Sequence, residues 1–202
     1  RWYERELREL KVPVIFNKEV TEETVRLAKP DVLIVATGSQ PKRLSIGDAD
    51  NVYTAEDVLN GVKPAGDSTI VIGAGLVGCE TALWLHDQGK KVTIVELAPK
   101  ILALAGPLCH ANHDMLHDLL IYKKIDIMTS SYVAEPVKGG FKVKTGDKDT
   151  IVPADSAIVA IGYRSERSLY DKVRNLVPEV YSWTLLLIGF ANTLGPSIAR
   201  GT

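Results

Sequence analysis

The stretch Thr69-Ile-Val-Ile-Gly73-Ala-Gly75-Leu-Val-Gly78-Cys-Glu80 decides the fold of this chain. Its first four residues are apolar or β-branched, which predicts a short buried strand. The glycines then spell G-x-G-x-x-G, and apolar residues follow at helical spacing until Gly89 predicts the end of a helix. Residues 91–96 predict a second strand. Together they form a strand–helix–strand unit of about 30 residues, the context in which such glycines bind a dinucleotide.

Each glycine of this motif has a physical reason. Gly73 lets the chain turn sharply after the strand. Gly75 has no Cβ, so the backbone can approach a pyrophosphate, and Gly78 lets the helix pack close to the strand. The free N–H groups and the dipole at the helix start favour the phosphate charge. The candidate loop consists of Gly73, Ala74, Gly75, Leu76, Val77 and Gly78.

Glu96 stands at the end of the second strand. A carboxylate there can accept hydrogen bonds from a ribose 2′-hydroxyl but repels a 2′-phosphate. Leu97, Ala98 and Pro99 follow, and the nearest cation, Lys100, comes only after the proline. We therefore predict that the site prefers NADH over NADPH.

Composition excludes several classes of protein. The 202 residues are 46% hydrophobic and 24% charged, with a net charge of −1, which gives no electrostatic case for nucleic acid or an acidic membrane. No apolar run approaches the about 20 residues of a membrane-spanning helix, and the charged residues 1–6 do not resemble a signal peptide. Cys79 and Cys109 form no C-x-x-C pair, which favours a reducing, cytoplasmic location.

The remaining elements follow from patterns of apolar residues and turn residues. Residues 31–36 predict a buried parallel strand that runs into Thr37-Gly38, and residues 41–67 a linker with one helix from Thr54. The other predicted strands are 12–16, 125–128, 141–145 with 150–152 as a hairpin, and 156–161, which ends at Gly162. The other predicted helices are 1–11, one from Thr21 to Lys29, 108–122 and a short exposed one over 164–173. The helix 108–122 is amphipathic, and its apolar side consists of Leu108, Met115, Leu116, Leu119 and Leu120.

His110, His113 and His117 lie on the predicted helix 108–122. His113 and His117 are four residues apart, the spacing of a two-histidine metal site. No carboxylate or thiolate set completes such a site in the sequence. We therefore interpret these histidines as solvated helix positions and predict no metal site.

The chain resembles the C-terminal nucleotide-binding half of NADH:flavin oxidoreductases of the 2-enoate reductase and 2,4-dienoyl-CoA reductase type. The likeness covers about residues 1–181 and implies the pyridine nucleotide-disulfide oxidoreductase fold. Its motifs are Val35-Ala-Thr-Gly38, the glycine stretch 71–80, Gly106-Pro-Leu-Cys-His110 and Val159-Ala-Ile-Gly162. The first two and the last are common to flavoproteins with two dinucleotide sites, whereas the matches at 106–110 and at Gly162-Tyr-Arg-Ser165 are closer to the enoate reductases.

The resemblance implies an α/β layout in which an NAD(P)H domain is inserted into an FAD domain. Residues 45–160 would be a Rossmann-like domain, with a parallel sheet, helices and a β-meander or hairpin. Residues 1–44 and 161–202 would be partial FAD-domain segments, the latter with an atypical tail. Ala36, Thr37, Gly38 and Gly162 would line the cofactors, although Ala36-Thr37-Gly38 by itself is more typical of a plain turn at a strand end. Glu80 would touch the nicotinamide ribose or amide or be only a first-turn helix carboxylate. NADH would reduce FAD, and electrons would pass through an iron–sulfur cluster to FMN in a barrel preceding this half, which reduces an activated C=C bond.

Two features differ from the family pattern. The chain contains one G-x-G-x-x-G, whereas the family's FAD domain opens with its own. Phe190 stands where the family has an Asp that contacts the flavin. We therefore expect the isolated chain to carry no stoichiometric FAD and to reduce no enoate by itself.

Two alternatives stay open. The first is a flavin disulfide reductase, against which the missing C-x-x-C weighs, and the second is a non-enzymatic NAD-binding module. Cys79 stands among packing residues, so we interpret it as structural rather than redox-active. The predicted site contains no catalytic acid, base or nucleophile, because its task is to orient a nicotinamide against a flavin.

Overall fold

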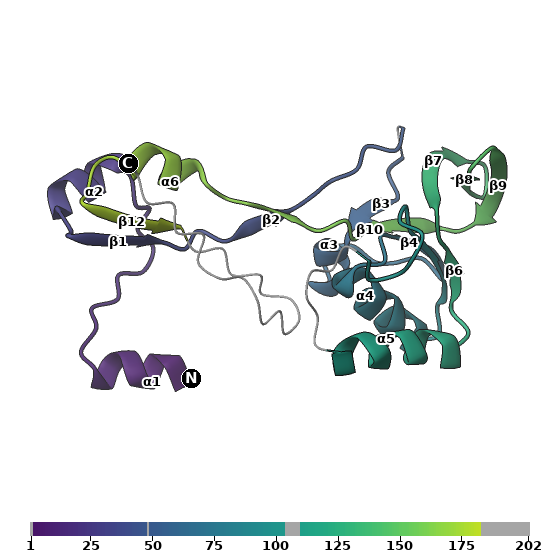
Figure 1. Cartoon of the computed structure of the whole chain (residues 1–202), viewed down its shortest axis with the longest axis horizontal. Coiled ribbons are helices and arrows are strands. Elements are labelled where there is room, and N and C mark those ends of the chain that lie inside the picture. The colour runs from purple at the N-terminus through teal and green to yellow at the C-terminus, as the bar shows by residue number, and fades with distance from the viewer. Residues whose placement is uncertain (1, 48, 104–109, 183–202) are drawn as a thin grey trace. The chain divides into compact units, whose positions relative to one another are not determined.

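The computed structural model describes residues 2–47, 49–103 and 110–182. The described residues form two compact units, one of residues 2–37 with 167–182 and one of residues 38–166 (Figure 1). The apolar tail with Phe190, and Gly106, Leu108 and Cys109 of the sequence argument, lie outside the described residues. No helix among the described residues is long and apolar enough to span a membrane.

The unit of residues 38–166 is built on a parallel sheet. Among the described residues the strand order is β3-β10-β4-β5-β6, and all neighbours in it are parallel. The strands are β3 (Val52–Thr54), β4 (Ser68–Ile72), β5 (Lys91–Val95), β6 (Asp126–Met128) and β10 (Ser156–Val159), and the helices are α3 (Ala55–Leu59), α4 (Leu76–Asp87) and α5 (His110–Tyr122).

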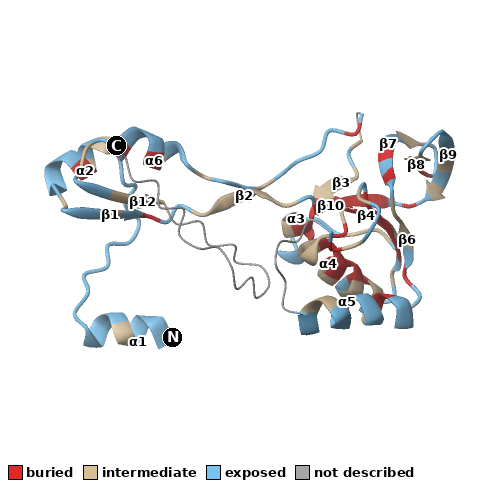
Figure 2. Cartoon of the chain, in the orientation of Figure 1, coloured by how far each residue is buried: buried red, intermediate tan, exposed pale blue. Residues whose placement is uncertain are grey.

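Both faces of this sheet are covered, which explains why its central strands are almost continuously apolar. Val71, Ile94 and Ile158 pack against the helices on one face. Side chains alternate along a strand, so neighbouring residues Ile70 and Ile72 point to the other face. Buried positions lie in the strands, in α3, α4 and α5, and in some of the loops between them (Figure 2).

A three-stranded antiparallel meander covers the second face. It consists of β7 (Ser131–Val137), β8 (Gly140–Thr145) and β9 (Lys148–Pro153). Phe141 and Val143 of β8 are fully buried against Ile70, Ile72 and Val159 of the sheet. The fold class expected from the sequence, a Rossmann-like sheet with helices and a β-meander, is therefore confirmed.

The same unit contains a short antiparallel ribbon, β2 (Ser39–Pro41) with β11 (Tyr163–Ser165). Glycines stand at its two ends, both with positive φ: Gly38 at +79° and Gly162 at +92°. The carbonyl oxygen of each accepts a backbone hydrogen bond, from Glu166 and Lys42 respectively. Glycine suits these positions because side chains disfavour that backbone region.

The smaller unit pairs β1 (Val32–Val35) in parallel with β12 (Glu179–Ser182). Its other elements are α1 (Trp2–Glu9), α2 (Glu22–Ala28) and α6 (Ser168–Val173). Its described core consists of Val25, Val35, Tyr170 and Val173. Val32 and Ile34 on the other side of β1 are exposed, so the expectation that this whole strand is buried was wrong.

Several other expectations were also wrong. Residues 12–16 form no strand, and all five are exposed. The linker contains β3. Residues 164–173 contain the end of β11 and then α6, whose Tyr170 and Val173 are buried. Met115 of α5 is 52% exposed instead of packing with Leu116 and Leu120.

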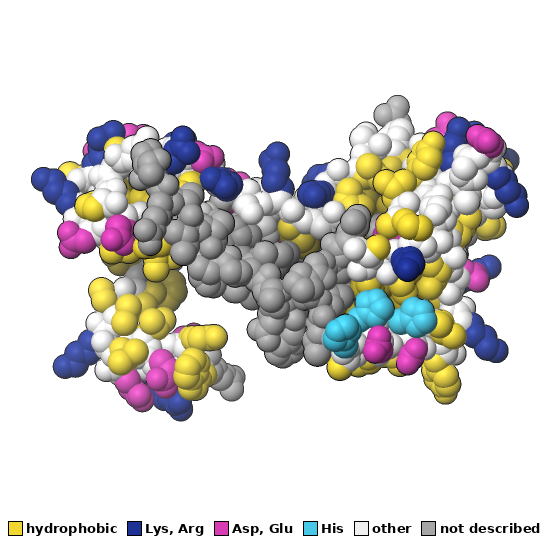
Figure 3. Space-filling view, in the orientation of Figure 1, with side chains coloured by type: hydrophobic (Ala, Val, Ile, Leu, Met, Phe, Trp, Pro, Cys, Tyr) yellow, Lys and Arg dark blue, Asp and Glu magenta, His cyan; other side chains and the backbone are white. Residues whose placement is uncertain are grey.

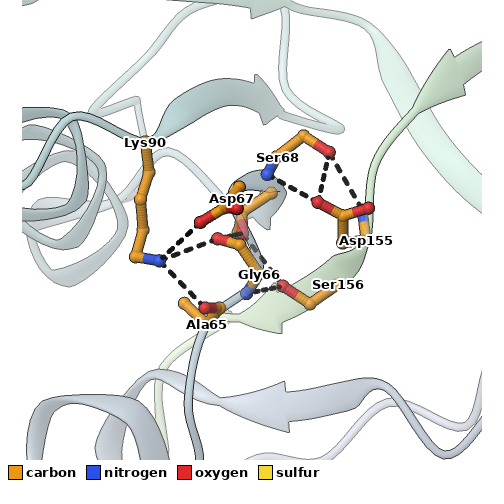
Figure 4. Close-up of polar contacts among 8 residues, drawn as sticks. Ala65, Gly66, Asp67, Ser68, Lys90, Asp155 and Ser156 are labelled. Atoms are coloured by element: carbon orange, nitrogen blue, oxygen red, sulfur yellow. Dashed lines mark hydrogen bonds and ion pairs between the residues drawn. The ribbon is translucent and has the colours of Figure 1, made fainter.

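A polar network ties the amino ends of β4, β5 and β10 together (Figure 4). The Asp155 carboxylate accepts hydrogen bonds from the Ser68 N–H and hydroxyl, both at 2.8 Å. Lys90 donates from Nζ to the carbonyl oxygens of Ala65 and Gly66, both at 3.0 Å. The network fixes where the chain enters the sheet, at the edge opposite the glycine loop.

Candidate functional site

The glycine loop joins the carboxyl end of β4 to the start of α4. Gly73 has φ +101°, and a Cβ there would lie 2.8 Å from the carbonyl oxygen of Ala160. A Cβ on Gly78 would collide with the carbonyl oxygen of Gly73. Both positions therefore require glycine, for the turn and for the close helix packing that the sequence predicts.

Gly75 is different, because a Cβ there would meet no atom of the described residues within 4 Å. Gly75 is the N-cap residue of α4, with φ −73°, and it supplies no side-chain cap. The first N–H groups of the helix are therefore not capped by that residue. The loop thus combines open space with backbone donors, which is the arrangement that binds a phosphate at a helix start.

Glu96 is nearly buried, 9% exposed, directly after β5. Its Oε2 accepts a hydrogen bond from the Ala74 N–H at 2.5 Å, and its Oε1 accepts one from the Ala98 N–H at 2.7 Å. The carboxylate is thus fixed against the glycine loop. Two carboxylate oxygens have about four acceptor sites, so capacity remains for ribose hydroxyls.

Ala74 is the centre of the loop's own bonding. Its carbonyl oxygen accepts from the Leu102 N–H at 2.7 Å and from the Cys79 thiol at 3.5 Å. Sequence reasoning did not find the contacts of Leu102 and Ala98, because no residue type marks a backbone donor. The Glu96 carboxylate is therefore fixed by backbone N–H groups, and the amino-acid types of those residues do not predict such contacts.

Glu80 and Cys79 lie side by side in α4 but in different surroundings. Burial raises the pKa of the half-buried Glu80 carboxyl. Burial raises the pKa of the Cys79 thiol to about 12, with smaller contributions from the charges of Glu96 and Glu80. A thiol with such a pKa is not a nucleophile at neutral pH, which supports a packing role for Cys79.

The structure brings Gly73, Ala74, Gly75, Gly78 and Glu96 together around one loop. Leu76 and Val77, the first residues of α4, are partly exposed beside it. Ala36 and Thr37 belong to the smaller unit, whereas Gly38 and Gly162 belong to the unit of the glycine loop. Ile161, next to Gly162, comes within 3.4 Å of the Cβ position of Gly73.

A cavity of about 200 Å³ lies elsewhere in the same unit. It is lined by residues of 43–54 and by Val159, and none of its lining residues belongs to the glycine loop. The histidines of α5 lie on the helix surface, and no group of three or more metal-ligating side chains occurs in the described part of the chain. The glycine loop with Glu96 is therefore the candidate site.

Comparison with known proteins identifies the family of the chain. Residues 3–177 match the family described as pyridine nucleotide-disulphide oxidoreductase. The chain is 50% identical over 192 residues to cinnamate reductase from Clostridium sporogenes, a match of 95% of this chain and 28% of that protein. It is 35% identical over 171 residues to NADH oxidase from Thermoanaerobacter brockii, covering 80% of this chain and 25% of that protein.

Among solved structures, the complex of 2-naphthoyl-CoA reductase with 2-naphthoyl-CoA superposes with a TM-score of 0.76 at 29% identity. That match covers 90% of this chain and 28% of the other. The chain thus spans less than a third of the length of each of these relatives. Since the family match includes the glycine loop, Glu96 and parts of both units, the chain belongs to the pyridine nucleotide-disulphide oxidoreductase family.

Proposed function

We propose that this chain is the NADH-binding part of a longer flavin-dependent reductase that acts on an activated C=C bond, such as that of a 2-enoate. The names of the two relatives, cinnamate reductase and 2-naphthoyl-CoA reductase, support this substrate class. The observation that carries the nucleotide role is the pairing of open space at Gly75 with the fixed carboxylate of Glu96.

Two features support binding of a dinucleotide here: the open space at Gly75 and the acceptor oxygens of Glu96. The pyrophosphate would lie over Gly75 and accept hydrogen bonds from the first N–H groups of α4. The ribose hydroxyls would donate to Glu96, and Glu80 would face the nicotinamide end. The bound nicotinamide supplies a hydride to a flavin, and the residues of this chain bind and orient it.

The finer organisation is also part of the proposal. Residues 45–160 would be the NAD(P)H domain, and residues 1–44 and 161–202 would be segments of an FAD domain, with Ala36, Thr37, Gly38 and Gly162 near the cofactors. FMN and an iron–sulfur cluster would reside in a preceding barrel. The full-length protein, purified without added cofactor, should show flavin and iron–sulfur absorbance and oxidise NADH when given cinnamate. Full-length protein with neither absorbance would contradict the proposal.

The choice between NADH and NADPH tests Glu96 directly. The carboxylate should repel a 2′-phosphate, at a cost of about 1–3 kcal/mol or roughly ten- to a hundredfold in affinity. Titration calorimetry of this chain with both nucleotides should show that preference, and Glu96→Gln should abolish it. Glu135→Gln changes an exposed carboxylate of the meander; it is the matched control and should leave the preference unchanged. Equal affinities in the parent chain would refute the role of Glu96.

The variant Gly75→Ala tests NADH binding without disturbing the fold. The added Cβ has open space, so the melting temperature should stay near that of the parent chain. The same Cβ would stand where we place the pyrophosphate, so NADH affinity should fall at least about tenfold. Gly78→Ala is the contrasting variant, because its Cβ collides with the backbone and should lower the melting temperature. Unchanged NADH affinity in Gly75→Ala would place the phosphates elsewhere.

A disulfide reductase is the second candidate, favoured by 32% identity over 142 residues to dihydrolipoyl dehydrogenase from Bacillus subtilis. That reaction needs a reactive dithiol. Within the described residues the one cysteine, Cys79, is buried with a raised pKa and contributes no such chemistry. The 50% identity to cinnamate reductase over almost the whole chain therefore favours the first proposal.

A further inference from the structure

We propose that α5 carries a surface site for one borderline divalent transition-metal ion, such as Cu²⁺, Ni²⁺ or Zn²⁺, formed by His113 and His117. The two residues are four apart in a regular helix, so their Cβ atoms lie about 5–6 Å from each other on one face. Figure 3 shows histidine side chains in a row over α5, next to acidic ones. The spacing lets two imidazoles approach one ion.

The hydrogen bonds of the two rings support this assignment. His113 Nδ1 lies 3.1 Å from Asp114 Oδ1, and His117 Nδ1 lies 3.4 Å from Asp118 Oδ1. A carboxylate only accepts, so each Nδ1 carries the hydrogen in these contacts. In the neutral ring, Nε2 then keeps its lone pair, which is the form that binds a metal.

Metal-ligating histidines commonly donate their other N–H to a carboxylate, which fixes the ring and raises its basicity. Here the sequence repeats the pair after one helical turn, as His113-Asp114-x-x-His117-Asp118. Sequence reasoning sought carboxylates as further ligands and found none. In the structure the two Asp carboxylates contact Nδ1 of each histidine and leave Nε2 for the ion. The carboxylates therefore support a two-histidine site without being ligands themselves.

The site is open to an ion and to water. The side chains of His113 and His117 are 45% and 47% exposed. Because the described residues hold no group of three or more ligands, waters would complete the coordination. Imidazole suits Cu²⁺, Ni²⁺ and Zn²⁺, whereas Mg²⁺ and Ca²⁺ require oxygen ligands. The site shares no residue with the glycine loop, so it is independent of the nucleotide proposal.

Titration calorimetry of the untagged chain with NiCl₂ tests the site. We expect about one Ni²⁺ per chain, tighter binding of Cu²⁺ in the Irving–Williams order, and no heat with MgCl₂ or CaCl₂. His113→Ala and His117→Ala should each abolish Ni²⁺ binding. Asp114→Asn and Asp118→Asn should each weaken it about tenfold, because the rings lose their carboxylate partners.

The matched control is His86→Ala, which removes a histidine of the neighbouring helix α4 and should leave Ni²⁺ binding intact. Circular dichroism should show an unchanged fold in all variants, since alanine is the best helix former and the substituted α5 positions are not buried. Unchanged Ni²⁺ binding in His113→Ala and His117→Ala, or an equal loss in His86→Ala, would overturn the proposal.

Discussion

Thr81 carries a buried hydroxyl that no described residue satisfies. It lies in α4 and is 1% exposed, and its Oγ1 has no hydrogen-bond partner in the described part of the chain. A buried polar group without a partner costs about 1–3 kcal/mol of stability. Its position, three residues after Gly78, places it on the same side of the helix as that closely packed glycine.

Replacing that hydroxyl with a methyl group should stabilise the protein. Val has the shape of Thr, so Thr81→Val removes the unsatisfied group without changing the packing, and the free energy of unfolding should rise by about 1 kcal/mol. Denaturant unfolding followed by circular dichroism measures it. Thr81→Ser is the control: it keeps the hydroxyl, loses a methyl group and should destabilise. A less stable Thr81→Val would mean that the hydroxyl has an unseen partner.

The Cys79 thiol should resist alkylation in the folded chain. It is fully buried, and burial raises its pKa to about 12, so the reactive thiolate is almost absent at neutral pH. Iodoacetamide treatment followed by peptide mass mapping should show Cys79 unmodified in native protein and modified in denaturant. Rapid native labelling of the Cys79 peptide would contradict the structural role.

At the scale of elements, the sequence predicts what local chemistry specifies. Thr54 and Asp57 form the expected capping box of α3: the Asp57 N–H donates to Thr54 Oγ1 and the Thr54 N–H to Asp57 Oδ2, both at 3.1 Å. The strand–helix–strand unit is likewise where its periodicity places it. The sequence signals that specify such elements lie within a few neighbouring residues, so the sequence alone predicts them.

Elements that depend on distant partners were missed. The three residues of β3 pair with β10, Val52 opposite Ala157, so no local pattern marks them. β7 contains Pro136, which suggests a break in a strand, and its register shifts between Val133 and Glu135. Residues 12–16 have strand-forming side chains but no strand partner among the described residues. Strand propensity becomes a strand only where a neighbouring strand exists.

The network at the amino ends of the strands should make stability depend on pH. Hydrogen bonds from Ser68 lower the pKa of the Asp155 carboxyl below its unfolded value. The stabilisation is therefore present above the unfolded pKa, about 3.9, and is lost as the pH falls through the folded pKa. Asp155→Asn should melt earlier than the parent chain at neutral pH, and the difference should shrink below about pH 4.

Thermal melts of both proteins across acidic and neutral buffers measure this difference, with Asp149→Asn on the exposed edge of the meander as the control. A gap between parent and Asp155→Asn that stays constant down to strongly acidic pH would show that the charge of Asp155 is not what holds β4 and β10 together.

At the scale of the whole chain, the two units have unequal cores. The larger unit buries apolar side chains on both faces of its sheet, in two clusters. The smaller unit buries few by comparison among its described residues, and one side of β1 is exposed. Since buried apolar area is the main stabilising contribution, the two units should differ in local stability.

Hydrogen exchange should reveal that difference in this isolated chain. Amides of β4 and β5 should resist exchange far longer than those of β1 and β12. The amides of β4 and β5 exchange only when the five-stranded sheet itself opens. Exchange followed by mass spectrometry measures this on peptides of 68–96 for β4 and β5, and of 22–37 and 168–182 for β1 and β12. Equal protection would mean that the two units unfold as one cooperative body.

The meander over the second face of the sheet determines the smallest part of this protein that could be grafted into another one. The minimal graft of the glycine loop into a designed enzyme would contain only the parallel strands and their helices. β7, β8 and β9 form one continuous segment between β6 and β10, which lies next to the central strand β4. Removing that segment would expose Ile70, Ile72 and Val159 as an apolar patch, and such patches promote aggregation. A useful graft must therefore carry the meander with the loop, or redesign that face with polar side chains.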